Sequence, residues 1–209
     1  MTTPQTIAVL TGDLINSAAL GPSGIDRAMD ALRDAAQTVE GWGICGPVHF
    51  TRHRGDGWQI VVDDPRYALR VAVMLRATLR AMGADTYIGI AEGPVDHPVG
   101  PNLNIENAPV FAMSGRALEI AKKTDYAINH ARQAAQGMAI LLNRICTEWT
   151  TVQAATVAAA MNNPNNDLSL TDIAERLGKS RQSVTKSLQS AWYWDITDAL
   201  LHLEHSYDD

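Results

Sequence analysis

The first half of the chain alternates short β-rich apolar runs with stretches in which apolar residues recur at helical spacing. The β-rich runs lie at residues 7–11, 48–53, 58–62 and 86–91, and the helical patterns lie at 25–39 and 65–82. This βαββαβ order predicts a sheet covered by helices. The short link Arg54-Gly55-Asp56-Gly57 between two of the runs is typical of a hairpin turn.

The second half has a mostly helical pattern. It runs from Phe111 to about Met161 with weak breaks at Thr124-Asp125 and Gly137, and a loop is predicted over 162–166. Beyond that loop, residues 169–177 and 181–192 are expected to form two helices joined by a glycine-containing turn. The pattern therefore predicts an α+β protein with an all-helical C-terminal part.

Composition narrows the classes of function. The chain has 209 residues, with 17 basic and 23 acidic side chains, and its net charge of −6 argues against non-specific nucleic-acid binding. Cys45 and Cys146 have no metal or redox spacing, which fits a reducing compartment. Because the apolar run near the start is too short for a signal or a membrane span, we expect a cytoplasmic protein without a membrane partner.

Two aspartates stand where chemistry is expected. Asp13 ends the first strand and Asp56 lies at the tip of the hairpin, and a right-handed βαββ unit places that strand beside the hairpin. Two carboxylates can share Mg²⁺ (or Mn²⁺), which keeps its other positions for water and phosphate oxygens. The alternative stays open that Arg54–Gly57 is only a good turn and that Asp13 is a capping or loop aspartate.

Four motifs occur in the order found in class III nucleotide cyclases. They are LTGDLINS at 10–17, RHRGDGWQ at 52–59, YIGIAEG at 87–93 and AMSGRAL at 112–118. Residues 6 to about 121 therefore resemble the palm-like cyclase domain, which has a ferredoxin-like βαββαβ fold. The resemblance implies that Asp13 and Asp56 bind metal and that Arg116 is the catalytic arginine if the protein is active.

The same resemblance implies a nucleotide site. Its residues are Leu14, Ile15, Asn16 and Ser17, which follow the first aspartate and wrap the phosphates, together with Arg52 and Gly55. Two positions depart from the cyclase pattern. Arg52 stands where a cyclase has a base-reading lysine, and Ala112 stands where it has the transition-state asparagine. Because loss of a donor aimed at the transition state slows a reaction by orders of magnitude, efficient purine cyclase activity is not expected.

The C-terminal pattern resembles a helix-turn-helix. Ile173 and Leu188 belong to the apolar faces of the two helices, and Gly178 permits the sharp turn. The outward side chains that could contact DNA bases and phosphates are Lys179, Ser180, Arg181, Gln182, Thr185 and Lys186. Residues 144–209 carry five basic and nine acidic groups, so a helical pair used only for packing or dimerisation is the alternative.

Over its whole length the chain resembles the SatD family, in which a cyclase-like part precedes a helix-turn-helix. The resemblance implies a palm domain at 1–125, a helical connector or dimerisation segment at 126–161 and a helix-turn-helix module at 162–209. We therefore expect a homodimeric regulator that couples binding of a nucleotide or phosphorylated ligand to DNA binding. A divergent cyclase or nucleotidyltransferase with a regulatory tail, and a palm that serves only as a dimerisation scaffold, are the alternatives.

Other conspicuous residues have simpler interpretations. Trp149, Trp192 and Trp194 are expected in the core of the C-terminal module. His53 is expected to pack or lie on the surface, and Glu92 to be a solvated loop acid. A solvated helix face is expected for Arg66, Arg70, Arg76 and Arg80.

Overall fold

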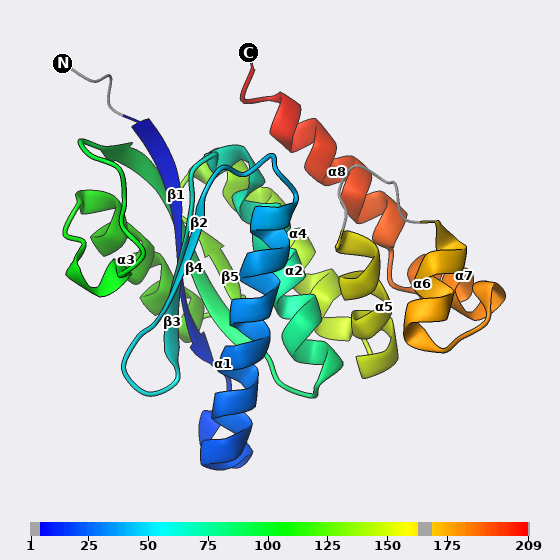
Figure 1. The fold of residues 1–209 in the computed structure, drawn as a ribbon. Coiled ribbons are helices and arrows are strands. Elements are labelled where there is room, and N and C mark those ends of the chain that lie inside the picture. Colours follow the sequence, from blue (N-terminus) through cyan, green and yellow to red (C-terminus); the bar gives the residue numbers. More distant parts are fainter. Residues whose placement is uncertain (1–4, 163–168, 209) are drawn as a thin grey trace.

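The computed structural model describes residues 5–162 and 169–208, and Figure 1 shows a sheet with helices on both faces. The strands are β1 (Gln5–Leu14), β2 (Val48–Arg52), β3 (Gly57–Val62), β4 (Thr86–Val95) and β5 (Ile128–His130). The helices are α1 (Ser17–Gly41), α2 (Ala68–Ala81), α3 (Pro109–Lys123), α4 (Gln133–Glu148), α5 (Thr151–Met161), α6 (Leu170–Leu177), α7 (Arg181–Ser190) and α8 (Tyr193–His205).

The five strands form one mixed sheet in the order β2-β3-β1-β4-β5. The first four pair antiparallel, and β5 lies parallel to β4. Strand β1 is therefore central, between the β2-β3 hairpin and β4, as the predicted βαββαβ order requires. That order is confirmed, whereas β5 was missed because a strand of three residues has no readable periodicity.

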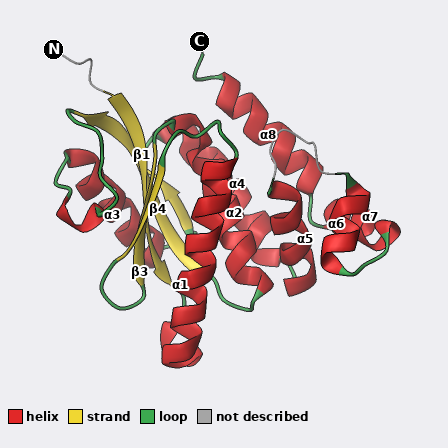
Figure 2. Cartoon of the chain, in the orientation of Figure 1, coloured by secondary structure: helices red, strands yellow, loops and turns green. Residues whose placement is uncertain are grey.

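Side chains of β1 alternate between two cores. Ala8 and Leu10 belong to the larger core, which includes residues of α1 and α2. Ile7 and Val9 belong to a smaller core that includes the start of α3. Figure 2 shows α3 on one side of the sheet and α1 and α2 on the other. Because successive side chains of a strand alternate, Asp13 faces the α3 side together with Ile7 and Val9.

The close approach of α3 to the sheet depends on Gly89 in the middle of β4. A Cβ atom at this position would lie 2.0 Å from the backbone nitrogen of Leu118 and 2.3 Å from the carbonyl oxygen of Ser114. Such distances are far inside van der Waals contact, so only glycine lets the α3 backbone pass here. This contact brings the C-terminal turn of α3 toward the end of β1.

The segment after β4 folds back over the edge strand β2. The Thr51 hydroxyl donates to the carbonyl of Pro101 at 3.2 Å and accepts from the backbone N–H of Leu103 at 3.0 Å. His53, just past β2, has Nδ1 2.6 Å from Oδ1 of Asn104. The loop after β4 is therefore held against the sheet beside its edge strand β2.

The C-terminal helices pack on α2 through α5. Trp149 is buried as predicted, and its indole N–H donates to the carbonyl of Ala191 at 2.9 Å. The expected core positions of the other two tryptophans are wrong, because Trp192 is 60% exposed and Trp194 43% exposed. Trp192 takes the left-handed conformation (φ 59°) at the turn into α8, where its side chain lies outside the packed faces.

The end of α8 is anchored to the sheet domain. Arg70 on α2 donates twice to Glu204 on α8, at 2.6 and 2.9 Å, and both side chains are buried. Tyr207 donates its hydroxyl to Glu92 on β4, and His130 Nε2 lies 3.2 Å from the same carboxylate. Burial favours the neutral acid, but the hydrogen bonds from His130 and Tyr207 keep the pKa of Glu92 below its ordinary value.

These contacts correct two expectations. The arginines of α2 do not form a solvated face, because Arg70 and Arg76 are 4% and 1% exposed and pair with acids from other segments. Glu92 is not a solvated loop acid, because it lies on β4 and its carboxylate is held by His130 and Tyr207. A charge pattern on one helix cannot show which distant carboxylates will neutralise it.

The remaining expectations have mixed outcomes. Both cysteines are buried, and burial raises the pKa of each thiol to about 12. The break at Thr124-Asp125 is confirmed, because α3 ends there, whereas Gly137 lies inside α4. The predicted loop at 162–166 lies outside the described residues apart from Asn162. Among the described residues, none of the helices combines the length and apolar character needed to cross a membrane.

Candidate functional site

The pairing of β1 with β3 brings Asp13 beside the hairpin that carries Asp56. Asp13 lies directly opposite Gly57, and the backbone N–H of Leu14 donates to the Asp56 carbonyl at 3.3 Å. Opposed residues in antiparallel strands have Cα atoms about 5 Å apart. The expected neighbourhood of the first strand and the hairpin is therefore confirmed, while metal binding by the two carboxylates stays a prediction.

A lysine that the sequence did not single out completes this cluster. Lys122, in the last turn of α3, places Nζ 2.7 Å from Oδ2 of Asp13 and 3.8 Å from Oε1 of Glu119. Partial burial favours the neutral amine, but Asp13 and, more weakly, Glu119 and Asp56 raise the pKa of Lys122 above its ordinary value. A positive charge therefore pairs with Asp13, and Asp56 is near enough to stabilise it weakly.

An open hollow of about 280 Å³ adjoins Asp56 between the start of α1 and the β2-β3 hairpin. Its lining residues are Ser17, Pro22, Ile25, Asp26, Arg52, Gly55 and Asp56. Ser17, Arg52, Gly55 and Asp56 were all candidates from the sequence, and the fold brings them to one surface. Gly55 has a left-handed φ of 70°, so the hairpin turn itself requires glycine there.

An ion pair forms one wall of this hollow. The Arg52 guanidinium lies 2.8 Å from Oδ1 of Asp26 on α1, and its Nε donates to the Gly55 carbonyl at 3.1 Å. Both charged side chains are substantially exposed, at 40% for Arg52 and 63% for Asp26. The pair offers donors and acceptors side by side, as the edge of a nucleobase requires. Asp26 was not a candidate, because no spacing rule links it to Arg52.

The structure places the four residues assigned to phosphate wrapping in different surroundings, and their role stays a prediction. The amides of Leu14 and Ile15 donate to the carbonyls of Asp56 and Asp85, and the Leu14 side chain is buried. Asn16 takes the left-handed conformation (φ 54°) and lines a different hollow. Of the four, Ser17 borders the hollow beside Asp56.

The predicted catalytic arginine is not part of this cluster. Arg116 is exposed on α3, and its side chain has no hydrogen bond or ion pair within the described residues. It lies six positions before Lys122, which puts it about a third of a turn away around the helix. Its catalytic role stays a prediction. Lys122 could have been noticed as a basic residue at the end of the same helix, but its partner could not.

The site offers a divalent cation two carboxylate ligands, Asp13 and Asp56, but no complete set of protein ligands within the described part of the chain. Among the described residues, no group of three or more His, Cys, Asp or Glu side chains could enclose a metal ion. Asp13 and Asp56 are two carboxylates at one end of the sheet, and Mg²⁺ is commonly held by one or two carboxylates with phosphate oxygens completing its shell. The residues therefore fit a metal that arrives with a phosphate ligand better than a closed structural site.

The C-terminal helix pair has the predicted local geometry. Ser169 and Asp172 form a capping box at the start of α6, Gly178 ends it with φ 61°, and Ser180 caps α7. Ile173, Ala174, Val184 and Leu188 are buried. Of the candidate DNA-contacting residues, Ser180, Arg181, Gln182 and Lys186 are exposed, and Lys179 and Thr185 are half-buried. Whether this surface binds DNA stays a prediction.

Comparisons with known proteins give similarity at the level of structure only. No protein-family model matches the chain, and no curated protein matches it. The chain is similar to the active GGEEF domain of a diguanylate cyclase from Vibrio cholerae, with 18% identity and a TM-score of 0.44 over 62% of this chain and 85% of that one. It is also similar to a bacterial light-regulated adenylyl cyclase, with 14% identity and a TM-score of 0.45 over 71% and 83%.

Proposed function

We propose that the protein is a cytoplasmic regulator that binds a nucleoside phosphate together with Mg²⁺ (or Mn²⁺) and binds DNA through its C-terminal helices. In this proposal residues 1–125 form the nucleotide-binding palm, 126–161 connect it and mediate homodimerisation, and 162–209 form the helix-turn-helix. The domain order is that of the SatD-like architecture inferred from the sequence.

One arrangement carries the nucleotide half of the proposal. Asp13, Asp56 and Lys122 lie at one end of the sheet, next to an open hollow whose wall holds the Arg52–Asp26 pair. Carboxylates bind a divalent ion, a lysine binds a phosphate as a point charge, and a guanidinium–carboxylate pair can hydrogen-bond a base. The three kinds of group therefore match the metal, the phosphate and the base of a metal–nucleotide complex.

Each residue would bind a different part of the ligand. Asp13 and Asp56 would hold the metal, which when bound draws negative charge from the phosphate oxygens. Lys122 would exchange part of its pairing with Asp13 for a phosphate oxygen. Arg52 and Asp26 would orient the base, and Ser17 would border the phosphates.

A melting-temperature panel tests this half directly. The full chain is heated with Mg²⁺ and each of ATP, GTP, CTP and UTP, alongside Asp56→Asn and a control, Asp34→Asn, which changes an exposed carboxylate on α1. At a ligand concentration of about 100 times Kd, we expect a rise of about 5–10 °C that Asp56→Asn loses and Asp34→Asn keeps. Equal shifts in all three proteins, or no shift with any triphosphate, would contradict the proposal.

The DNA half rests on the surface of α7. Arg181, Gln182 and Lys186 are exposed on a helix that follows α6 after a tight glycine turn, and this supports the use of α7 as a recognition helix. A dimer would double the phosphate contacts of a module that is acidic overall.

Catalysis is the alternative that uses the same groups. A divergent cyclase or nucleotidyltransferase would require the same metal and phosphate site, with Arg116 as a further cation. Incubation with each triphosphate and Mn²⁺, followed by mass spectrometry, distinguishes the two. A cyclic or oligomeric product that disappears in Asp56→Asn would show that the site does more than bind.

A further inference from the structure

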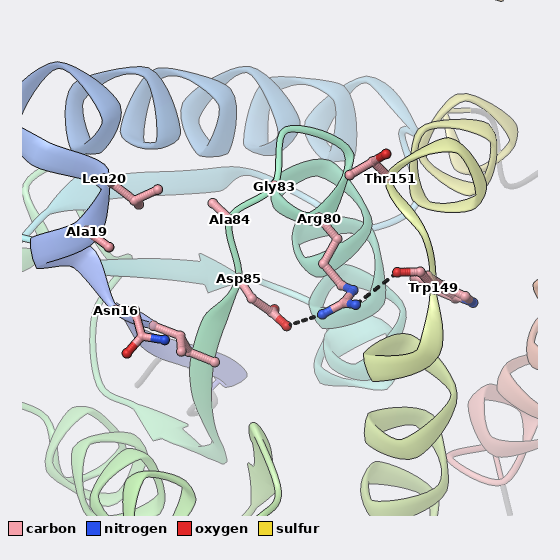
Figure 3. A pocket seen from close by; sticks show the side chains of 10 residues that line it. Asn16, Ala19, Leu20, Arg80, Gly83, Ala84, Asp85, Trp149 and Thr151 are labelled. Carbon is pink, nitrogen blue, oxygen red and sulfur yellow. Dashed lines mark hydrogen bonds and ion pairs between the residues drawn. The ribbon is translucent and has the colours of Figure 1, made fainter.

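A second and larger hollow, of about 390 Å³, lies where three connecting segments meet. Figure 3 shows Asn16, Ala19 and Leu20, from the β1-α1 connection and the start of α1, on one side. Trp149 and Thr151, from the α4-α5 connection and the start of α5, lie on the other side. Arg80 and Asp85, which flank the α2-β4 connection, lie between them. The volume falls in the range of small-molecule sites.

The charges at the base of this hollow do not balance. Asp85 accepts from Arg76 at 2.9 and 2.6 Å and from Arg80 at 2.7 Å, so one carboxylate faces two guanidinium groups. The exposed fraction of the side chain is only 1% for Arg76, 20% for Arg80 and 15% for Asp85. Burial works against both charges, but their mutual hydrogen bonds raise the pKa of Arg76 and lower that of Asp85. A surplus positive charge therefore remains in a largely buried place.

Arg80 carries this surplus at the wall of the hollow. Its Nη2 donates to the carbonyls of Thr147 and Trp149 at 2.6 and 2.9 Å, and Nη1 donates to Asp85. Its Nε is buried without an acceptor. Among the residues that line the hollow, Asp85 is the single acid, and it already receives the backbone N–H of Thr86 as well as both arginines. Because that Nε atom is closed off from solvent, a ligand in the hollow would pair with Nη1, which gives one of its two N–H groups to Asp85.

We propose that this hollow binds a small organic anion, with an oxyanion head against Arg80 and an apolar body against Ala19, Leu20 and Ala84. Burial of an incompletely paired charge is costly, and an anionic ligand would complete the pairing. The apolar side chains on the opposite wall supply the surface that a purely inorganic ion would not use.

The position of the hollow gives such a ligand a role. Ile15 and Asn16 in its lining follow Asp13 by two and three residues, and Thr151 begins α5, which packs against the α6-α7 pair. A ligand there contacts both the segment next to the nucleotide site and the helix that leads to the C-terminal module. The site would therefore serve an effector that acts on both halves.

Titrations of the ¹⁵N-labelled full chain test the proposal without metal or nucleotide. Benzoate and phenyl phosphate are the anionic probes, which distinguish a carboxylate from a phosphate head, and benzamide is the neutral probe. We expect saturable shifts of the Gly83 and Ala84 amides with at least one anion and not with benzamide. Affinity should fall about tenfold or more in Arg80→Gln and in Ala19→Leu, which fills the hollow without changing its charge.

Matched controls keep the outcome decisive. Arg27→Gln removes an exposed arginine, and Ala18→Leu adds the same bulk one residue earlier, outside the lining. Both should bind as the unmodified protein does, and Asp56→Asn should bind equally well because the two hollows are separate. If neither anion saturates, if benzamide binds as tightly, or if Ala19→Leu has no effect, the proposal is overturned whatever the result for nucleotides.

Discussion

Lys122 Nζ lies 2.7 Å from Oδ2 of Asp13, so α3 provides a positive charge where β1 ends. The same carboxylate is the one that we propose as a ligand of a divalent cation. If the proposed site is correct, the lysine and the metal would compete for Asp13 when no nucleotide is bound, and they would cooperate when phosphate oxygens share the positive charge.

Lys122→Met should consequently change the affinities for Mg²⁺ alone and for the Mg²⁺–triphosphate complex in opposite directions. Mg²⁺ alone should bind about fivefold more tightly, because a competing cation is removed, and the Mg²⁺–triphosphate complex about fivefold more weakly, because a phosphate partner is lost. Calorimetric titration of each ligand measures both. Lys123→Met, at the exposed neighbouring position, is the control. A change of the same sign for both ligands would contradict this division of roles.

DNA binding through α7 should depend on individual cations. Arg181→Gln and Lys186→Gln are each expected to weaken binding and to reduce the slope of log affinity against log salt by about one. Arg144→Gln is the control, because its guanidinium is 76% exposed on α4 and pairs with Glu148. Fluorescence anisotropy on a pool of duplexes at several salt concentrations gives the slopes. Unchanged slopes in both variants would argue for a helical pair that only packs or dimerises.

The anchor between α2 and α8 should contribute strongly to stability. Glu204→Gln leaves the buried Arg70 guanidinium without its charged partner, so we expect a loss of about 3–5 kcal/mol in the free energy of unfolding. Glu148→Gln breaks an exposed ion pair and should cost less than about 0.5 kcal/mol. Urea denaturation compares the two variants. Similar midpoints would show that the buried pair adds no net stability.

Low pH should remove the contribution of Asp85 to the stability of the folded protein. Its pKa is lowered in the folded protein, because the hydrogen bonds from Arg76 and Arg80 outweigh the effect of burial. The stability that it adds is therefore complete above the unfolded value of about 4 and is lost as pH falls through the lower folded value. Asp85→Asn should be destabilised by about 2–4 kcal/mol at neutral pH. Thermal melts of both proteins from pH 7 to pH 3 should show this gap narrowing below about pH 4. A constant gap would exclude the charge of Asp85 as its cause.

The sequence predicted what depends on local rules. Hydrophobic periodicity gave the βαββαβ order, and the handedness of the crossover placed Asp13 beside the Asp56 hairpin. Turn and capping chemistry also located the α6-α7 pair, with Ser169 and Ser180 at the helix starts. Each of these inferences uses residues that are close in the chain or joined by a single crossover.

What the sequence missed depends on distant partners. Lys122, Arg76 and Glu92 look like ordinary surface charges until the fold shows that they lie against Asp13, Asp85 and His130. The hollow at Arg80 could not be predicted either, because it is built from three segments that are more than fifty residues apart in the chain. The charge of one side chain does not show which distant residue it will pair with in the folded protein.

The loop held against β2 has a further consequence for behaviour at high concentration. Strand β2 is an edge strand, and an unprotected edge of this kind attracts the backbone of another molecule into continuous ribbons that precipitate. Because the Thr51 side chain holds Pro101 and Leu103 against the sheet beside that edge, we expect removal of this loop to increase the tendency of the protein to aggregate.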